Sequence, residues 1–417
     1  MNIPVLVVGV CVVIASTISS AQESLTGTIL LRDVVDATLS ANPQLRSFPL
    51  RKEALQGEND TASLKPALNI GGGIEDALGT GDLKDFARAE VTLRLSQVIE
   101  MGDKREARIG IVNRRLGLLA TQQEVVELDL LGQVVMRFID VAAAQERVAL
   151  QQQATEIAAQ TVVLIQPLVT AGRSPQFELS RAEAALIRAQ IAQQSARALL
   201  ESARIRLANM WASSTAQFDE VESSLLTVGP ADSVESILAH LESSPNIELY
   251  ASESRLFEAE LRQAQSRQQS DVGWSAGIRH LKEVDDTALA FEVTIPLFSK
   301  SRASGVIRAA RANIQEVEAR RLTALNKITS EISSQYQQLV QAILEVDSLQ
   351  QDVIPILENV LRQTREVYEA GNYSYVELVS AQQEYLDAQL SLINSAANAH
   401  RLRAEIERLS GLSISGQ

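Results

Sequence analysis

Residues 287–298 read TALAFEVTIPLF, a short segment in which apolar side chains alternate with small or polar ones. Alternation with a period of two predicts a β-strand with one apolar face. Beyond this segment the period changes, and apolar residues recur in ten steps over 35 residues, an average of 3.5. This spacing is typical of a left-handed coiled coil, so we expect the strand to continue into a helix of roughly 70 residues, about 100 Å long. The seam residues are Leu325, Ile328, Ile332, Tyr336, Leu339, Ile343, Val346, Leu349, Val353, Ile356 and Val360.

The composition favours long packed helices over a compact enzyme. Aromatic residues make up 4% of the 417 residues, and the net charge is −14 with a pI near 4.9. An acidic balance argues against nucleic acid as a partner and fits either simple solubility or a conduit for cations. The sequence contains no nucleophile elbow, P-loop or dinucleotide fingerprint, and His240, His280 and His400 share no metal-ligand spacing. We therefore predict neither an enzyme nor a bound cofactor or metal.

The first 21 residues resemble a secretory signal peptide. They carry no charged side chain and end in Ser19-Ser20-Ala21, so we expect cleavage before Gln22, with an uncleaved anchor as the alternative. Cys11, the only cysteine, lies in this segment, so the mature chain has no thiol. No later segment has the roughly 18 consecutive apolar residues of a membrane-spanning helix, and strands closed into a barrel are the expected way to cross a bilayer.

The remaining chain reads as one unit present twice. The first unit, expected over 22–211, has short helices at 31–39 and 48–62, strands at 68–76 and 89–95, and helices at 102–170 and from 174 to 211. A linker at 212–232 in the equatorial region, a second unit at 233–411 and a tail at 412–417 complete the chain. At an offset of 202, Ser244-Pro245 matches Asn42-Pro43 and Gly273 matches Gly71, while Ala370-Gly371 matches Ala171-Gly172 at 199.

The match is closest in the last helix of each unit, where ten positions keep the same spacing of three and four residues at an offset of 199. Small residues alternate with large ones there, which lets neighbouring helices approach closely. Turns, strands and helices in register predict a duplicated unit. The positions are Leu179, Ala182, Leu186, Ala189, Gln193, Ala196, Leu200, Ala203, Leu207 and Met210, matched by Leu378, Ala381, Tyr385, Ala388, Leu392, Ser395, Ala399, Leu402, Ile406 and Leu409.

Each unit contributes two strands, and four strands cannot close a barrel. Open strand edges are not tolerated in lipid, so transmembrane strands would require oligomerisation. Two copies would give eight strands and a filled interior, whereas three copies would give twelve strands and a lumen. We therefore predict a mainly α-helical chain whose strands close a 12-stranded barrel in a homotrimer.

The strand faces fit this prediction. Val91, Leu93 and Leu95, and Leu289, Phe291, Val293 and Ile295, would face lipid. Glu90, Thr92, Arg94, Glu292 and Thr294 would face a wet lumen. From alternation alone, an amphipathic sheet in a water-soluble protein is the alternative.

The order helix–helix–strand–strand–long helix–shorter helix, twice over, resembles the TolC-type outer-membrane channels of tripartite efflux pumps. The resemblance covers residues 28–411 and rests on Leu95–Arg105, on Ile295-Pro296-Leu297-Phe298, and on Tyr368-Glu369-Ala370-Gly371 leading into Glu377-Leu378-Val379. The run Glu-x-Gly-x-Lys-Arg at 100–105 is similar to the subgroup that serves heavy-metal cation pumps. The family implies a passive homotrimeric conduit, with a 12-stranded outer-membrane β-barrel that continues into a periplasmic α-helical coiled-coil barrel. Such a conduit meets an adaptor protein and an inner-membrane pump of the RND type.

The resemblance also implies roles for the two helix connections farthest from the strands. They match the sites where the adaptor docks, although ordinary helix capping explains the same Gly and Ser residues. The residues are Ala171, Gly172, Ser174, Ala370, Gly371, Asn372 and Ser374.

Glu178 and Glu377, again 199 residues apart, match an acidic position that lines the periplasmic constriction of the family. The alternative for Glu377 is a capping box with Ser374, a role that Glu178 fits less well. Ser380 stands where relatives can have a second acidic residue, and Tyr373 where some have a basic one. The constriction is therefore expected to differ here, with Arg173 or Tyr373 as its lid.

Two interpretations compete with a metal-efflux channel. One is a drug-efflux or type I secretion channel of the same fold. The other is a periplasmic coiled-coil adaptor or scaffold, which would need a β-rich flank that this chain lacks. The two Pro residues expected inside long helices, Pro167 and Pro355, predict either kinks or helix ends.

Overall fold

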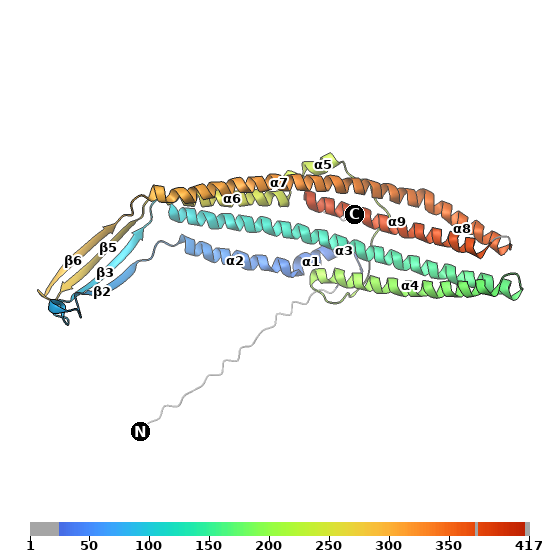
Figure 1. Cartoon of the computed structure of the whole chain (residues 1–417), viewed down its shortest axis with the longest axis horizontal. Helices are drawn as coiled ribbons and strands as arrows, with labels where there is room; N and C mark the ends of the chain where they lie inside the picture. Colours follow the sequence, from blue (N-terminus) through green and yellow to red (C-terminus); the bar gives the residue numbers. More distant parts are fainter. Residues whose placement is uncertain (1–24, 372–373, 413–417) are drawn as a thin grey trace, which may run out of the picture.

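The computed structural model describes residues 25–371 and 374–412. The predicted signal peptide, the tail beyond Leu412, and Asn372 and Tyr373 lie outside the described residues. Figure 1 shows an elongated molecule with a sheet at one end and helices that run to the other. None of the described helices combines the length and apolar character needed to cross a membrane.

The same order of elements occurs in both halves. The first half contains α1 (Leu31–Ala41), α2 (Pro43–Ser63), β2 (Asn69–Glu75), β3 (Glu90–Ile99), α3 (Lys104–Thr170) and α4 (Gln176–Ala208). The second half contains α5 (Val234–Ala239), α6 (Pro245–Ser266), β5 (Val272–Leu281), β6 (Asp286–Thr294), α7 (Ser299–Ser348), α8 (Ile354–Glu369) and α9 (Tyr375–Ser410). Proline stands at the first position of both α2 and α6, where its missing N–H costs nothing.

The sheet is antiparallel in the order β2–β3–β5–β6, so the two halves meet where β3 pairs with β5. One face carries no Asp, Glu, Lys or Arg side chain and includes the predicted lipid-facing residues of β3 and β6. Leu289, Phe291 and Val293 on β6 are strongly exposed. β2 and β6 leave two edges without a partner in the described chain.

The chain contains a second, smaller sheet that the sequence did not predict. β1 (Gly27–Ile29) pairs in parallel with β4 (Phe218–Val221), which lies inside the predicted linker 212–232. Phe218 is fully buried against Trp211, and both belong to the largest core, midway along the molecule. This pairing ties the chain segment before α1 to the segment between the two halves.

The predicted packing of α4 and α9 is largely confirmed. In α9 every predicted position except Leu402 is buried. In α4 the buried positions are Leu179, Ala182, Ala196, Ala203 and Leu207, and Met210 is buried in the turn that follows. The predicted end of the first of these helices is wrong by three residues, because α4 gives way to a 3-10 turn at Asn209–Trp211.

The long helix of the second half departs from the prediction near Pro355. A single helix of roughly 70 residues is replaced by α7, a π-helical segment at Leu349–Val353, and α8. The N–H of Ile354 bonds to the carbonyl of Leu349, five residues back. Because Pro355 has no N–H to donate and its ring crowds the preceding turn, one wider turn relieves the clash. The prediction of a kink or end at Pro355 is thus resolved as a π-helical turn, whereas α3 runs through Pro167 to Thr170.

This extra residue in the turn moves the seam. Up to Val346 the predicted seam is correct, with Ile332, Leu339 and Val346 buried. Beyond the π-helical segment the prediction is wrong, since the predicted Ile356 is 61% exposed. The positions that pack inward are one residue later: Ile354, Leu361 and Tyr368, spaced by seven.

Candidate functional site

The two helix connections farthest from the sheet lie at one end of the molecule (Figure 1). The α3–α4 and α8–α9 hairpins are joined there by a small apolar core, the tip core, whose buried members are Ile165, Leu179, Ala182, Tyr368, Tyr375 and Leu378. Leu179, Ala182 and Leu378 were predicted as packed helix positions, but only the structure shows that the two hairpins share one core. The predicted docking residues Ala171, Gly172, Ala370 and Gly371 lie exposed beyond this core.

Glu178 is held by hydrogen bonds rather than free. Ser174 Oγ donates to Glu178 Oε2 at 2.5 Å, and Tyr368 Oη donates to the same oxygen at 3.2 Å. The side chain is half-buried between the two hairpins. α4 begins at Gln176 with Pro175 as its N-cap, so Glu178 occupies the third helical position. The start of this helix is therefore two residues later than the predicted residue 174.

Burial raises the pKa of the Tyr368 phenol, and the nearby negative charge of Glu178 raises it further, although the hydrogen bond to Ser174 acts in the opposite direction. Burial likewise raises the pKa of Tyr375. Both tyrosines therefore stay neutral at physiological pH and can donate a hydrogen bond. The sequence did not reveal the role of Tyr368, because its partner Glu178 lies 190 residues away in the chain.

Glu377 has a different environment from Glu178. It is exposed, accepts the Ser374 N–H at 3.1 Å and also bonds the Ser374 hydroxyl, which confirms the capping box. Arg173 reaches toward the other hairpin: its Nη2 lies 3.2 Å from where a Cβ on Gly371 would stand. The structure thus places Arg173 beside Gly371 of the α8–α9 connection and Glu178 beside Tyr368 of α8. Tyr373 lies outside the described residues.

The polar face of the sheet carries all of its charged side chains. Glu90, Arg94 and Glu292 are on this face, as predicted, together with Glu75, Arg279 and Asp286. Arg279 was missed, although Ser275, Gly277 and Arg279 alternate with apolar residues in the sequence. Its Nη1 donates to Glu90 Oε2 at 3.0 Å, with Glu75 at 3.8 Å.

Arg94 lies next to two glycines of the neighbouring strands, Gly71 on β2 and Gly277 on β5. A Cβ on Gly71 would be 3.5 Å from Arg94 Nε, and a Cβ on Gly277 would be 2.5 Å from the Leu93 carbonyl and 2.9 Å from Arg94 Cβ. The absence of a side chain at Gly277 therefore permits the close approach of β3 and β5 beside Arg94.

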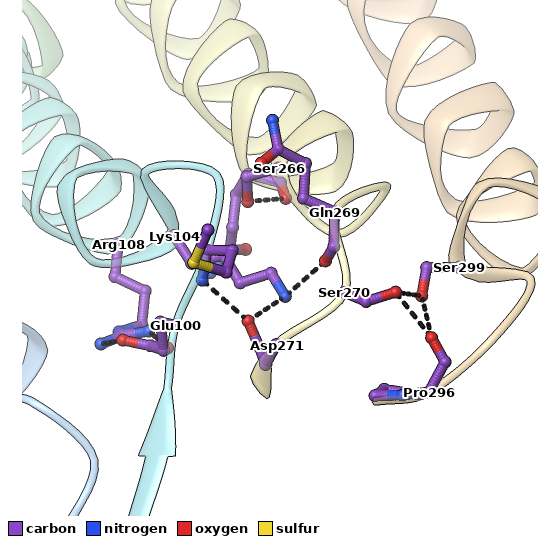
Figure 2. Close-up of polar contacts among 11 residues, drawn as sticks. Glu100, Lys104, Arg108, Ser266, Gln269, Ser270, Asp271, Pro296 and Ser299 are labelled. Atoms are coloured by element: carbon purple, nitrogen blue, oxygen red, sulfur yellow. Dashed lines mark hydrogen bonds and ion pairs between the residues drawn. The ribbon is translucent and has the colours of Figure 1, made fainter. Parts of the chain in front are cut away.

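Charged residues also organise the junction between sheet and helices (Figure 2). Lys104 Nζ donates to Asp271 Oδ1 at 2.6 Å and to the Gln269 carbonyl at 2.9 Å, while the Met101 N–H donates to Asp271 at 3.1 Å. Glu100 forms a two-pronged ion pair with Arg108. The Glu-x-Gly-x-Lys-Arg run thus contributes Glu100 and Lys104 to ion pairs that tie β3 and α3 to the segment before β5.

The histidines make no metal site. Within residues 25–371 and 374–412, no group of three His, Cys, Asp or Glu side chains is placed to hold a metal ion. His400 Nε2 lies 3.0 Å from the Leu225 carbonyl, and burial lowers its pKa, so it is a neutral core residue. His280 stands 3.8 Å from Asp285 at the outer end of the sheet.

The chain is similar to known proteins in sequence and in fold. Residues 34–213 match the family described as Outer membrane efflux protein. The cobalt-zinc-cadmium resistance protein CzcC of Cupriavidus metallidurans is 26% identical over 320 residues, 77% of each chain, and the nickel-cobalt-cadmium resistance protein NccC of Alcaligenes xylosoxydans is 22% identical over 336 residues, 78% of this chain and 75% of the relative.

Solved structures share the fold over almost the whole chain. The outer membrane protein VceC of Vibrio cholerae gives a TM-score of 0.73 at 18% identity, covering 91% of this chain and 96% of that one. CusC gives 0.71 at 13% identity, covering 93% of each. The family match and the named relatives indicate an outer-membrane efflux channel rather than an enzyme. The chain therefore resembles the outer membrane efflux protein family in its first half and shares the fold of these solved structures over nearly its whole length.

Proposed function

We propose that three copies of this chain form a passive channel for divalent metal cations, with a twelve-stranded barrel in the outer membrane and helices that extend into the periplasm. The observation that carries the proposal is the four-stranded sheet, which has an uncharged, apolar, exposed face and two unpaired edges. Such a sheet is unstable in lipid unless its edges are paired.

The dimensions of the sheet support a membrane crossing. β3 and β5 have 10 residues each and β6 has 9, and a tilted transmembrane strand needs about 9–11. Pairing of the β6 edge of one copy with the β2 edge of the next would repeat the unit three times and close the barrel. The duplicated halves, which we place at 22–211 and 233–411, would then alternate around the axis.

The substrate class is inferred from two observations. The matching relatives are named for resistance to cobalt, zinc, cadmium and nickel. In addition, the polar face of the sheet presents four carboxylates against two guanidinium groups, a net charge of −2 per copy that would attract cations to a lumen. The carboxylates are Glu75, Glu90, Asp286 and Glu292, and the guanidinium groups are Arg94 and Arg279.

The partners we propose are a periplasmic adaptor and an RND-type inner-membrane pump, with the adaptor docked on the hairpin tips. Glu178 and Glu377 would contribute up to six carboxylates near the axis of a trimer. Glu178 and Arg173 are proposed to hold the two tips of one copy together, and Tyr373 to lie near the constriction.

Growth of a deletion strain tests the proposal. Loss of the gene is expected to sensitise cells to cobalt, zinc, cadmium or nickel but not to hydrophobic drugs, and the wild-type gene should restore resistance. A Gly371→Pro variant, which loses the left-handed φ of +80° at the docking tip, should fail to restore it, while Gly305→Ala, in open space on α7, should succeed. Sensitivity to drugs alone would refute metal export.

A further inference from the structure

The connection between β6 and α7 has two exposed apolar side chains in an unfavourable arrangement. Leu297 is 67% exposed and Phe298 is 78% exposed. Phe298 also has φ of +63°, in the left-handed region that bulky residues avoid. The strained backbone conformation and the exposure of an aromatic ring to water are both unfavourable. These features are explained if the ring is not in water.

The first turns of α7 carry unmatched positive charge. Lys300 and Arg302 are exposed at the N-terminal end of the helix, where the helix dipole disfavours cations. α7 has no acidic residue before Glu316, and among the described residues neither cation has an ion pair. Farther along the same helix, by contrast, Arg320 pairs with Glu253.

The connection between α2 and β2 repeats this arrangement at the same end of the sheet (Figure 1). Leu64 is 64% exposed and Leu68 is 54% exposed, and between them lies Lys65, exposed and without an ion pair among residues 25–371 and 374–412. In a chain with a net charge of −14, unmatched cations beside exposed apolar side chains at two connections form a distinct surface.

The two remaining connections, β3–α3 and α6–β5, differ because their charges are mostly neutralised. Their carboxylates Glu100, Glu106 and Asp271 pair with Arg108, Arg105 and Lys104, which leaves Asp103 exposed. Asp60, near the end of α2, is likewise exposed, so two carboxylates without an ion pair among the described residues stand against the three cations Lys65, Lys300 and Arg302.

We propose that Leu64, Lys65, Leu297, Phe298, Lys300 and Arg302, the basic belt, dock onto anionic phospholipid headgroups of the membrane leaflet nearest the helices. The proposal rests on the proposed function, since it requires the sheet to lie in a bilayer. Leu64, Leu297 and Phe298 enter the boundary between the lipid headgroups and the acyl chains, where aromatic rings are favoured. The long basic side chains extend from there to the phosphate groups of the lipids. Each cation near an anionic surface contributes about 1 kcal/mol, on the order of a fivefold preference over a zwitterionic lipid.

Trp274 provides the reporter for a test. It lies on the apolar face of β5, two residues from the helical end of the strand, whereas the other tryptophan, Trp211, is buried in the central core. The purified full chain is reconstituted into phosphatidylcholine vesicles that contain brominated phosphatidylglycerol or, at the same mole fraction, brominated phosphatidylcholine. Quenching of Trp274 then reports which lipid occupies the belt.

The belt variant replaces Lys65, Lys300 and Arg302 by Gln. The control variant replaces three exposed cations outside the belt, Arg188, Arg197 and Lys327, also by Gln. Its net charge therefore changes by the same amount as that of the belt variant.

Wild type and control are expected to show severalfold stronger quenching by brominated phosphatidylglycerol, and the belt variant is expected to lose this preference. Equal quenching by the two lipids in wild type, or an unchanged preference in the belt variant, would overturn the inference while leaving the channel intact. An absence of quenching by either lipid would instead show that the sheet is not in the bilayer, and the proposed function would fail with it.

Discussion

The contact at Gly277 gives the sharpest test of the sheet. In Gly277→Ala the new methyl group would stand 2.5 Å from the backbone carbonyl oxygen of Leu93 and 2.9 Å from Arg94 Cβ. The first of these atoms belongs to the backbone of the paired strand, so no side-chain rotation can relieve the clash. β3 and β5, which join the two halves of the chain, must move apart.

The size of the effect follows from the distances. Ordinary contact begins at 3.4 Å, so the strands must separate locally by about 0.9 Å. Overpacking of this kind costs roughly 1–3 kcal/mol, and weakening one or two ladder hydrogen bonds adds about 0.5–1.5 kcal/mol each. We expect Gly277→Ala to lower the free energy of unfolding by about 2–4 kcal/mol.

Gly73→Ala is the matched control on the same face of the sheet. Nothing lies within 4 Å of the position of its new methyl group, so the smaller entropy of the unfolded chain should stabilise the protein by about 0.5–1 kcal/mol. The assay is denaturant unfolding in detergent micelles, followed by Trp274 fluorescence. Equal midpoints for the two variants, or a stable Gly277→Ala protein, would show that β3 and β5 do not approach as described.

Three further predictions concern the tip and the junction. Glu377→Ala should remove the capping box and weaken the start of α9 by about 0.5–2 kcal/mol, measured as faster amide exchange there; exchange that does not change would contradict the cap. Burial raises the pKa of Tyr368, so the neutral phenol stabilises the fold fully below pH about 10, and this stabilisation is lost as the pH rises through the raised pKa. An absorbance titration at 295 nm should therefore show a tyrosine that ionises late and that is absent in Tyr368→Phe. Tyr368→Phe should also lower the free energy of unfolding by about 1–3 kcal/mol, because it removes the hydroxyl that donates to Glu178. An unchanged free energy of unfolding would show that this hydrogen bond does not form. Asp271→Ala should cost about 2–3 kcal/mol by leaving the mostly buried Lys104 charge unpaired, and Lys104→Met should recover part of that loss in the double variant; strictly additive losses would refute the pair.

Periodicity predicted the larger helices and strands because many residues in each of them follow the same spacing. β3 and β6 have a continuous two-residue alternation, and the buried face of α9 follows its three-and-four spacing almost without exception. The capping box at Ser374 and Glu377 could also be read locally, because both partners lie within one helical turn.

Features that depend on a few residues or on distant partners were not predictable in this way. β1 and β4 have three and four residues, too few to show a period. The shift of the seam to Ile354 depends on how the backbone accommodates Pro355, and the sequence does not specify whether a kink or a π-helical turn results. The bond of Tyr368 to Glu178 joins residues 190 apart, so only the packing of the two hairpins reveals it.

The mass of the particle extracted from membranes in mild detergent tests the central claim most directly. The two unpaired edges, β2 and β6, require neighbouring copies if the apolar face of the sheet contacts lipid. Native mass spectrometry is therefore expected to give a particle of three chains that is recovered from the outer-membrane fraction. A stable single chain, or a dimer with both edges satisfied, would contradict the account.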